Sequence, residues 1–228
     1  MQISEIFHSV QGEGRYSGEP SVFVRTSGCN LRCWFCDTPY TSWNPEGENR
    51  AWDAIVEDVL QYDCTHVVIT GGEPMLQAEV QPLAAALRER GKFITVETAG
   101  TVDLLLQADL MSISPKLSNS VPSLERAGVW RARHERDRHR PQVIRRLLRD
   151  YNYQLKFVID QPSDLDEVEA YLAEIPEAEP RHVWLMPQAV TAEALTEKSS
   201  WVEAAAGQRG YQFTSRLHIE LYGNVRGK

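Results

Sequence analysis

A long hydrophobic segment is missing from this sequence of 228 residues. No apolar run approaches the roughly 20 residues that a helix needs to cross a bilayer. The first twenty residues carry acidic and polar positions and lack the apolar centre of a secretion signal. We therefore expect a cytoplasmic protein that does not insert into membranes.

Positive charge is also scarce. The chain has 24 lysines and arginines against 32 aspartates and glutamates, which gives a formal net charge of −8 at pH 7. Because nucleic-acid binding normally needs clustered positive charge, we expect no nucleic acid among the partners. Hydrophobic residues make up 42% and charged residues 25%, which is the composition of a globular protein with a buried core.

Cysteine is scarce too, and its placement is uneven. Three of the four cysteines, Cys29, Cys33 and Cys36, lie within eight positions in the pattern C-x3-C-x2-C, whereas Cys64 lies far along the chain. In a reducing compartment, clustered thiols act more often as metal ligands or catalysts than as disulfide partners.

Three clustered thiols fit an iron–sulfur cluster better than a zinc ion. Structural zinc usually takes four ligands, often as two separated pairs, and the sequence has no second pair with that spacing. A cluster of four irons normally takes four thiolates, so three thiolates leave one iron open to a ligand. We therefore expect a 4Fe–4S cluster with an open site; the alternatives are a zinc site completed by His or Asp, and reduced cysteines in a core.

Short β-branched runs alternate with segments of helical periodicity. The expected strands are residues 21–26, 65–70, 92–98, 109–114, 155–160 and 182–187. The expected helices are residues 51–62, 79–90, 164–175 and 191–206. This alternation predicts the α/β class with parallel strands. Because a closed barrel of eight units takes about 250 residues, we expect an incomplete, open βα barrel of about six parallel strands, with functional loops at their carboxyl ends.

Residues 125–150 differ in composition, because many arginines with interspersed acids interrupt the alternation of strands and helices. We expect a single domain over residues 1–228 that carries an Arg-rich insert at about 118–150. Two interpretations of the insert stay open. It is either a basic face for a nucleic acid or another anionic partner, or a solvated helix–loop insert with local ion pairs.

The cysteine motif resembles the signature of the radical S-adenosylmethionine (SAM) enzymes. In that family, C-x3-C-x2-C follows the first barrel strand, and an aromatic residue, here Phe35, precedes the third cysteine. The resemblance implies that the open iron binds the amino and carboxylate groups of SAM. It also implies that electron transfer from the cluster cleaves SAM to a 5′-deoxyadenosyl radical, while the protein positions and shields the reactants.

Three loops that follow expected strands are placed to hold SAM. Glycines permit close approach of the backbone, a carboxylate can accept from an ammonium group, and serine, lysine and glutamine offer bonds to ribose, carboxylate and adenine. GGEP matches the family motif that contacts the SAM amino group; taken alone, each loop also fits an ordinary turn. The candidate SAM ligands are Gly72 and Glu73 in GGEP, Ser114, Pro115 and Lys116 in SPK, and Gln188.

The segment before the cysteines is unusual as well. QGEG, residues 11–14, has a glycine on each side of Glu13, which leaves the backbone accessible to a planar ligand. Arg25 lies in the strand that leads to the cysteines, where a buried guanidinium needs an anion. Taken alone, these residues also fit a hairpin turn and an Arg–Glu pair at the edge of the core.

Together with GCNLRCWFCDT, TGGEP, ETAGT, SPK and RLHIELYGN, this segment is similar to the 7-carboxy-7-deazaguanine synthase family over nearly the whole chain. The resemblance implies a carbon–nitrogen lyase that converts 6-carboxy-5,6,7,8-tetrahydropterin into 7-carboxy-7-deazaguanine with loss of ammonia. This step belongs to the biosynthesis of queuosine and other 7-deazapurines. The resemblance further implies a homodimer and a reductant such as flavodoxin or ferredoxin.

The same resemblance assigns roles to residues around the pterin. It implies that Arg25 pairs with the substrate carboxylate, that Thr38 ligates a magnesium ion (Mg²⁺), and that His218 closes over the substrate from a C-terminal strand. The other implied substrate contacts are Val10, Gln11, Gly12, Glu13 and Thr70. The implied radical takes the hydrogen at C6 of the pterin, and no side chain acts as a catalytic group beyond the cofactor radical.

Two other functions stay open from the sequence. A glycyl-radical activating enzyme shares the cluster and GGEP but acts on a polypeptide, and the QGEG segment would then lack a purpose. A non-catalytic metal-binding module would hold zinc and act through the Arg-rich insert. An exposed polypeptide groove would favour the first function, and a colourless protein containing zinc would favour the second.

Overall fold

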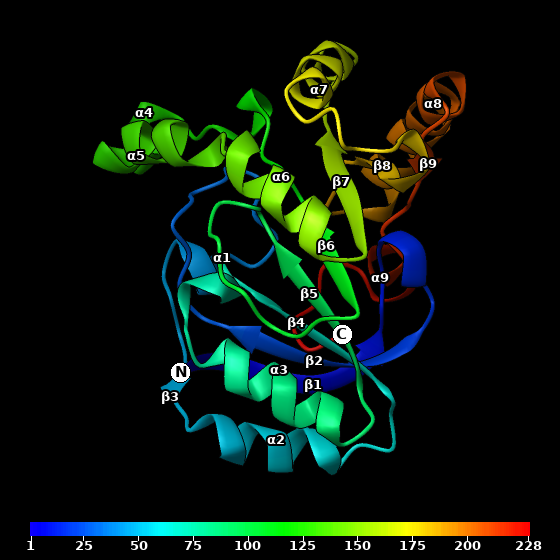
Figure 1. Cartoon of the computed structure of the whole chain (residues 1–228). Coiled ribbons are helices and arrows are strands. Elements are labelled where there is room, and N and C mark those ends of the chain that lie inside the picture. Colours follow the sequence, from blue (N-terminus) through cyan, green and yellow to red (C-terminus); the bar gives the residue numbers. More distant parts are fainter.

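Nine strands form one sheet in the order β3-β1-β2-β4-β5-β6-β7-β8-β9 in the computed structural model, which describes residues 1–228 (Figure 1). From β2 to β9 all neighbouring strands are parallel, whereas β1 runs antiparallel to β2 and β3. The two end strands do not pair, so the barrel is open, as expected. The strands are β1 Gln2–Val10, β2 Pro20–Thr26, β3 Glu48–Asn49, β4 His66–Gly71, β5 Phe93–Thr98, β6 Leu110–Ile113, β7 Tyr153–Ile159, β8 Val183–Pro187 and β9 Gln212–Phe213.

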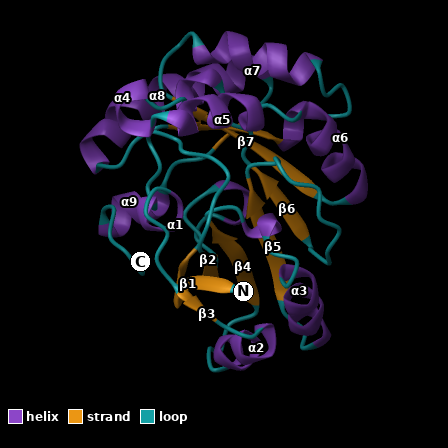
Figure 2. Cartoon of the chain, turned by 90° about the vertical axis from the view of Figure 1, so that its left-hand side faces the viewer, coloured by secondary structure: helices purple, strands orange, loops and turns teal.

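Helices surround this sheet, and Figure 2 shows α2, α3, α6 and α7 around the central strands. The α-helices are α1 Pro39–Ser42, α2 Trp52–Leu60, α3 Val80–Glu89, α4 Leu124–Ala127, α5 Val129–Arg138, α6 Pro141–Asp150, α7 Asp164–Ala173, α8 Ala192–Arg209 and α9 Leu217–Tyr222. Short 3-10 helices lie at Gly14–Tyr16, Pro74–Leu76, Ser118–Ser120 and Pro180–His182. None of the helices combines the length and the apolar character that crossing a bilayer requires.

The expected elements are present. The six expected strands correspond to β2, β4, β5, β6, β7 and β8, and the four expected helices correspond to α2, α3, α7 and α8. The structure adds the short strands β3 and β9, the antiparallel strand β1, and helix α9 near the C-terminal end of the chain. The α/β class and the parallel arrangement of the six expected strands are confirmed.

Alternation along the parallel strands divides their side chains between two environments. One set packs against the helices in a core cluster of 37 buried residues, and in β7 this set comprises Tyr153, Leu155, Phe157 and Ile159. The other set faces the inside of the open barrel. Lys156 therefore points away from the core, although its neighbours in the sequence are apolar and buried.

Helix α6 shows that part of the Arg-rich segment belongs to the regular repeat. Pro141 occupies the first turn, where its missing N–H leaves no bond unmade. Ile144, Leu147 and Leu148 form an apolar stripe that is buried in the core. Helix α6 is thus the crossover between β6 and β7, and the interruption expected over residues 125–150 is confined to α4 and α5, which lie together at one end of the molecule (Figure 1).

Candidate active site

A cavity of about 470 Å³ lies where the parallel strands end. Its lining comes from segments that are far apart in the sequence, because the loops after parallel strands meet at one end of a sheet. The predicted residues that line it are Val10, Gln11, Gly12, Glu13, Arg25, Cys29, Cys33, Cys36, Thr38, Thr70, Gly72, Ser114, Lys116, Gln188 and His218. Glu73 and Pro115 lie next to lining residues in the sequence but do not line the cavity themselves.

Inward-facing positions of the strands supply the polar floor of the cavity. Besides Arg25 and Thr70, they bring Glu97 of β5, Ser112 of β6 and Lys156 of β7 to the lining. Thr70, Ser112 and Lys156 are buried. Because a buried polar group is costly without a partner, these side chains must bond one another or a ligand.

The cysteine loop, residues 27–38, begins directly after β2 and brings three thiols to the cavity. All of these thiols are free, and burial raises the pKa of the Cys33 thiol to about 12. The Sγ of Cys29 accepts a hydrogen bond from the backbone N–H of Leu31 at 3.4 Å. Three sulfur donors that line one cavity, one of them already bonded by an amide, fit an iron–sulfur cluster that takes three protein ligands.

Cys64 lies away from this loop. It precedes β4, at the opposite end of the strand from the cavity, and it does not line the cavity. Its Sγ donates to the carbonyl oxygens of Pro20 and His66, at 3.2 and 3.4 Å. The fourth cysteine is therefore placed to bond the backbone and not to join the other three.

The GGEP loop packs on the cysteine loop through backbone contacts. The N–H of Gly72 donates to the carbonyl oxygen of Thr26 at 3.1 Å, and the N–H of Glu73 donates to that of Gly28 at 2.9 Å. A Cβ on Gly72 would lie 2.1 Å from the Gly28 oxygen, and Gly71 has a φ of +125°. Both glycines are thus needed for the contact between the two loops, apart from any approach to a ligand.

Glu73 is fully buried, and its carboxylate fastens the GGEP loop to the end of β5. It accepts hydrogen bonds from the Thr98 hydroxyl at 2.9 Å and from the backbone N–H of Ala99 at 2.8 Å. Burial raises the pKa of Glu73, while these hydrogen bonds oppose the shift. The expected contact between Glu73 and the SAM amino group stays a prediction, because the carboxylate here bonds protein groups.

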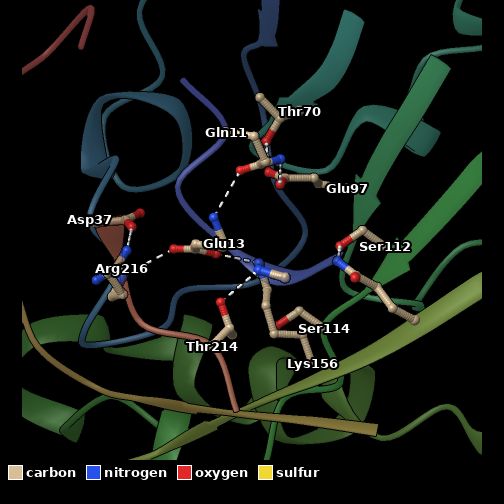
Figure 3. A network of polar contacts seen from close by, with 12 residues as sticks. Gln11, Glu13, Asp37, Thr70, Glu97, Ser112, Ser114, Lys156, Thr214 and Arg216 are labelled. Atoms are coloured by element: carbon tan, nitrogen blue, oxygen red, sulfur yellow. Dashed lines mark hydrogen bonds and ion pairs between the residues drawn. The ribbon is translucent and has the colours of Figure 1, made fainter. Parts of the chain in front are cut away.

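A buried ion-pair network crosses the floor of the cavity (Figure 3). The carboxylate of Glu13 lies between Lys156 and Arg216, with 3.0 Å between Arg216 Nε and Glu13 Oε1. Arg216 also pairs with Asp37, the residue after the third cysteine of the loop. Burial opposes ionisation of Glu13, but the charges of Lys156 and Arg216 hold its pKa well below the ordinary value.

His218 lies in helix α9, so the expected C-terminal strand is wrong at this position. Its ring packs so closely on Gly12 that a Cβ on Gly12 would lie 1.9 Å from His218 Nδ1. Ligand atoms of Glu13, Asp37 and His218 all lie within 4.8 Å of one another, a spacing that suits a metal ion. The Arg216 guanidinium forms ion pairs with the carboxylates of both Glu13 and Asp37.

A second polar group joins the QGEG segment to β4 and β5. Glu97 accepts hydrogen bonds from Gln11 Nε2 at 3.1 Å and from the Thr70 hydroxyl at 2.7 Å. Figure 3 shows these three side chains together above Glu13. A carboxylate with further acceptor capacity in this position can bond the N–H edge of a planar heterocycle.

The contacts of Arg25 agree with both interpretations of its sequence position, an Arg–Glu pair at the edge of the core and a binding site for an anion. Its Nε donates to Glu5 Oε1 at 2.7 Å, its guanidinium lies 5.3 Å from the Phe7 ring centroid, and it also lines the cavity. The Tyr40 hydroxyl donates to the same Glu5 oxygen at 2.8 Å. Because Glu5 engages only Nε, the two terminal nitrogens of Arg25 stay available to an anion in the cavity.

The remaining predicted residues lie around the rim of the cavity. Thr38 is the N-cap residue of α1 and lines the cavity beside the cysteines. Lys116 Nζ donates to the Ser114 carbonyl at 2.7 Å and to its hydroxyl at 2.6 Å. The side-chain oxygen of Gln188 accepts from Lys198 at 3.4 Å.

The sequence alone does not indicate six charged residues that line the cavity: Asp37, Glu97, Lys156, Arg216, Arg226 and Lys228. A charge inside a buried strand was the available signal for two of them, because lysine and glutamate are almost never fully buried without a partner. Glu97 is the penultimate residue of FITVET, and Lys156 lies within YQLKFVI. Asp37 and Arg216 carry no such local signal, because their pairing depends on the fold.

Comparisons with known proteins agree with this geometry. Residues 23–149 match the Radical SAM superfamily. The chain is 43% identical to 7-carboxy-7-deazaguanine synthase of Halobacterium salinarum, over 99% of this chain and 91% of the relative. It is 42% identical to 7-carboxy-7-deazaguanine synthase of Rhodopirellula baltica, over 99% of this chain and 88% of the relative.

The fold has a counterpart among solved structures. The crystal structure of QueE from Escherichia coli superposes with a TM-score of 0.67 at 23% sequence identity, over 95% of this chain and 94% of that one. At that identity the likeness concerns the fold. The open βα fold is therefore shared by the two structures.

Proposed function

The chain belongs to the 7-carboxy-7-deazaguanine synthase family within the radical SAM superfamily, and from this premise we propose that it converts 6-carboxy-5,6,7,8-tetrahydropterin into 7-carboxy-7-deazaguanine with loss of ammonia. The product leads to queuosine and other 7-deazapurines. The observation that carries the proposal is one cavity that joins three free cysteines to a charged pocket built by the QGEG segment, β2 and β5.

The family implies a 4Fe–4S cluster and SAM as cofactors. When bound, they supply an electron and a radical that removes a hydrogen atom. Cys29, Cys33 and Cys36 would hold the cluster. The residues proposed to hold SAM are Gly72, Glu73, Ser114, Pro115, Lys116 and Gln188.

The chain's own residues would position the pterin. The free terminal nitrogens of Arg25 match a carboxylate, which two parallel N–H donors bind with fixed orientation. Glu97, held by Gln11 and Thr70, would accept from the N–H edge of the pterin ring. The other proposed contacts are Val10, Gly12, Glu13 and His218. Fixing the carboxylate and the ring edge at opposite ends aims the C6–H bond in one direction.

We also propose a magnesium ion at Thr38. A hard cation prefers oxygen ligands and usually keeps several waters, so one hydroxyl together with substrate oxygens suffices. Thr38 lines the cavity two residues after the last cysteine, on the same wall as Asp37. The ion would then bind only together with the substrate, whose oxygens complete the coordination.

Partners beyond the small molecule follow from the family resemblance. A one-electron reductant such as flavodoxin or ferredoxin would approach at the cysteine loop, where the Trp34 side chain is 40% exposed. A homodimer is proposed on the resemblance alone. The free, clustered thiols suit the cytosol, where they stay reduced.

Anaerobic turnover followed by mass spectrometry tests the function. The reconstituted protein is incubated with SAM, dithionite, magnesium and the carboxytetrahydropterin, and we expect 7-carboxy-7-deazaguanine with release of ammonia. Arg25→Ala is expected to cleave SAM without forming this product. A protein that cleaves SAM but leaves the pterin unchanged, or one that binds only zinc, would overturn the proposal.

A further inference from the structure

Among the contacts between the Arg-rich segment and the cysteine loop is one from a buried histidine. His134 of α5 is fully buried, and its Nδ1 lies 3.0 Å from the backbone nitrogen of Arg32, the residue directly before Cys33. We propose that His134 is a positioning residue that fixes the backbone of the cysteine loop for cluster binding. The α4–α5 hairpin, residues 124–138, is then a support for the cluster and not only a solvated insert.

The hydrogen bonds around His134 define its protonation. The Ser120 hydroxyl donates to the carbonyl oxygen of Leu117 at 2.6 Å, so its oxygen accepts from His134 Nε2–H at 2.9 Å. The proton is thus on Nε2, and Nδ1 is the bare acceptor that the N–H of Arg32 requires. Burial lowers the pKa of His134 to about 4, which keeps this neutral form at physiological pH.

Further bonds hold the other side of Cys33. The backbone N–H of Trp34 donates to the Ser120 carbonyl at 3.1 Å, and Arg126 of α4 donates to the Trp34 carbonyl at 3.0 Å. Backbone groups of the residues before and after the middle cysteine, Arg32 and Trp34, are therefore both bonded to the hairpin or to the turn at Ser120. This arrangement leaves the Cys33 thiol directed at the cavity, which it lines.

The Arg32 side chain also links the cysteine loop to the α4–α5 hairpin. Its guanidinium lies 3.7 Å from the Trp130 ring centroid of α5 and donates to the Cys29 carbonyl oxygen at 2.8 Å. Arg32 thus joins the first cysteine to the hairpin through its side chain and the second through its backbone. Ligand orientation and hydrogen bonds near the sulfurs set the potential of a cluster, so these contacts bear on its reduction.

The inference rests on the proposed function only in taking the cysteine loop as the cluster site, and its test does not need turnover. His134→Asn keeps an acceptor where Nδ1 lies, whereas His134→Gln keeps a polar group where Nε2 lies and His134→Ala keeps neither. Arg136→Ala is the matched control, because Arg136 is exposed on the same helix and pairs only with Asp137.

The readouts are amide hydrogen exchange of residues 29–36 in the full chain, with and without the reconstituted cluster, and the midpoint potential and electron paramagnetic resonance (EPR) spectrum of the reduced cluster. Loss of a buried hydrogen bond predicts about tenfold faster exchange at Arg32 in the Ala and Gln variants, with a shifted potential and spectrum. His134→Asn and Arg136→Ala are expected to match the wild type.

Ser120→Ala, which leaves the histidine in place but removes the partner of its Nε2–H, is expected to give the same changes in weaker form. It keeps the test open where a histidine variant fails to fold. Equal changes in the Asn, Gln and Ala variants would reduce His134 to a packing role, and unchanged exchange and spectra in all of them would likewise overturn the proposal. Product formation plays no part in this outcome, so failure of the proposed function would be seen separately.

Discussion

Cys64 and the three cavity cysteines have different surroundings, and this difference predicts how their alanine variants cleave SAM. Replacing Cys29, Cys33 or Cys36 by alanine removes one of the three proposed sulfur ligands, so we expect SAM cleavage to fall to background. Cys64→Ala is expected to keep cleavage near the wild-type rate, because its thiol bonds carbonyl groups before β4. The measurement is 5′-deoxyadenosine formed under anaerobic conditions; loss of cleavage in the Cys64 variant would reveal a fourth ligand.

Lys156 predicts a pH-dependent loss of stability. Lys156→Met leaves the buried Glu13 carboxylate with Arg216 alone, which we expect to cost about 3 kcal/mol of the free energy of unfolding at pH 7. The folded-state pKa of Glu13 is depressed, so the stability it contributes is present above its unfolded pKa and is lost as pH falls below about 4. The difference between variant and wild type is therefore expected to shrink in acid.

Urea unfolding of the apoprotein at pH 7 and at about pH 3.5 measures this effect. Lys198→Met is the matched control, because Lys198 also pairs with a carboxylate, that of Asp160, but both side chains are more exposed. We expect the control to change stability by less than about 1 kcal/mol at pH 7. A deficit for Lys156→Met that stays constant across pH would contradict the assigned ion pair.

A substitution at Gly12 tests the role of its contact with His218. Gly12→Ala places a Cβ 1.9 Å from the present position of His218 Nδ1, so the ring must move away from the cavity. We expect product formation to fall by at least about tenfold while the fold persists, because a small displacement of a positioning group costs much of its effect. Gly207→Ala on α8, where an added Cβ meets nothing within 4 Å, is the control. Equal turnover in the two variants would remove the contact from the account.

At the scale of the elements, the sequence predicted what local pattern determines. The sequence indicates β2 and β4 to β8, because strands buried on both faces carry apolar, β-branched runs. The sequence does not indicate β1, because QISEIFHSV mixes polar and apolar residues without a regular alternation. The strand expected at His218 rests on the family resemblance, and LHIELY is too short to show a helical period that would indicate α9 instead.

Among the cavity residues, too, only those with a local sequence signal could be predicted. The cysteines and GGEP could be predicted because each motif is local in the sequence. The pairing of Glu13 with Lys156 and Arg216 could not, since 143 and 203 residues separate the partners. Only the fold places these residues together: Lys156 faces the inside of the barrel from β7, and the segments after β1 and β9 bring Glu13 and Arg216 to it.

Helix α6 predicts that the two halves of the Arg-rich segment differ in their contribution to stability. Ile144→Ala removes a fully buried side chain from the core and is expected to cost about 2–5 kcal/mol. Val129→Ala at the start of α5, where the side chain is 74% exposed, is expected to cost less than about 0.5 kcal/mol. Chemical unfolding of both variants provides the comparison. Similar values would show that α6 is not part of the core.

At the scale of the whole molecule, the charge of the cavity lining is opposite in sign to the net charge of the chain. The chain carries a formal charge of −8, yet its cavity is lined by six lysines and arginines and only three acidic side chains. Focusing of this positive potential favours anionic ligands, and the proposed substrate and SAM both carry carboxylates. We also propose that the chain is one domain, because all nine strands share one sheet.

Electron paramagnetic resonance of the anaerobically reconstituted, reduced protein tests the central claim most directly. This claim is that the three cysteines that line one cavity would leave an iron of the cluster open to SAM. The account predicts a reduced 4Fe–4S signal whose g-values change when SAM is added and stay unchanged when buffer without SAM is added. A signal that does not respond to SAM, or no cluster signal in protein with intact Cys29, Cys33 and Cys36, would contradict it.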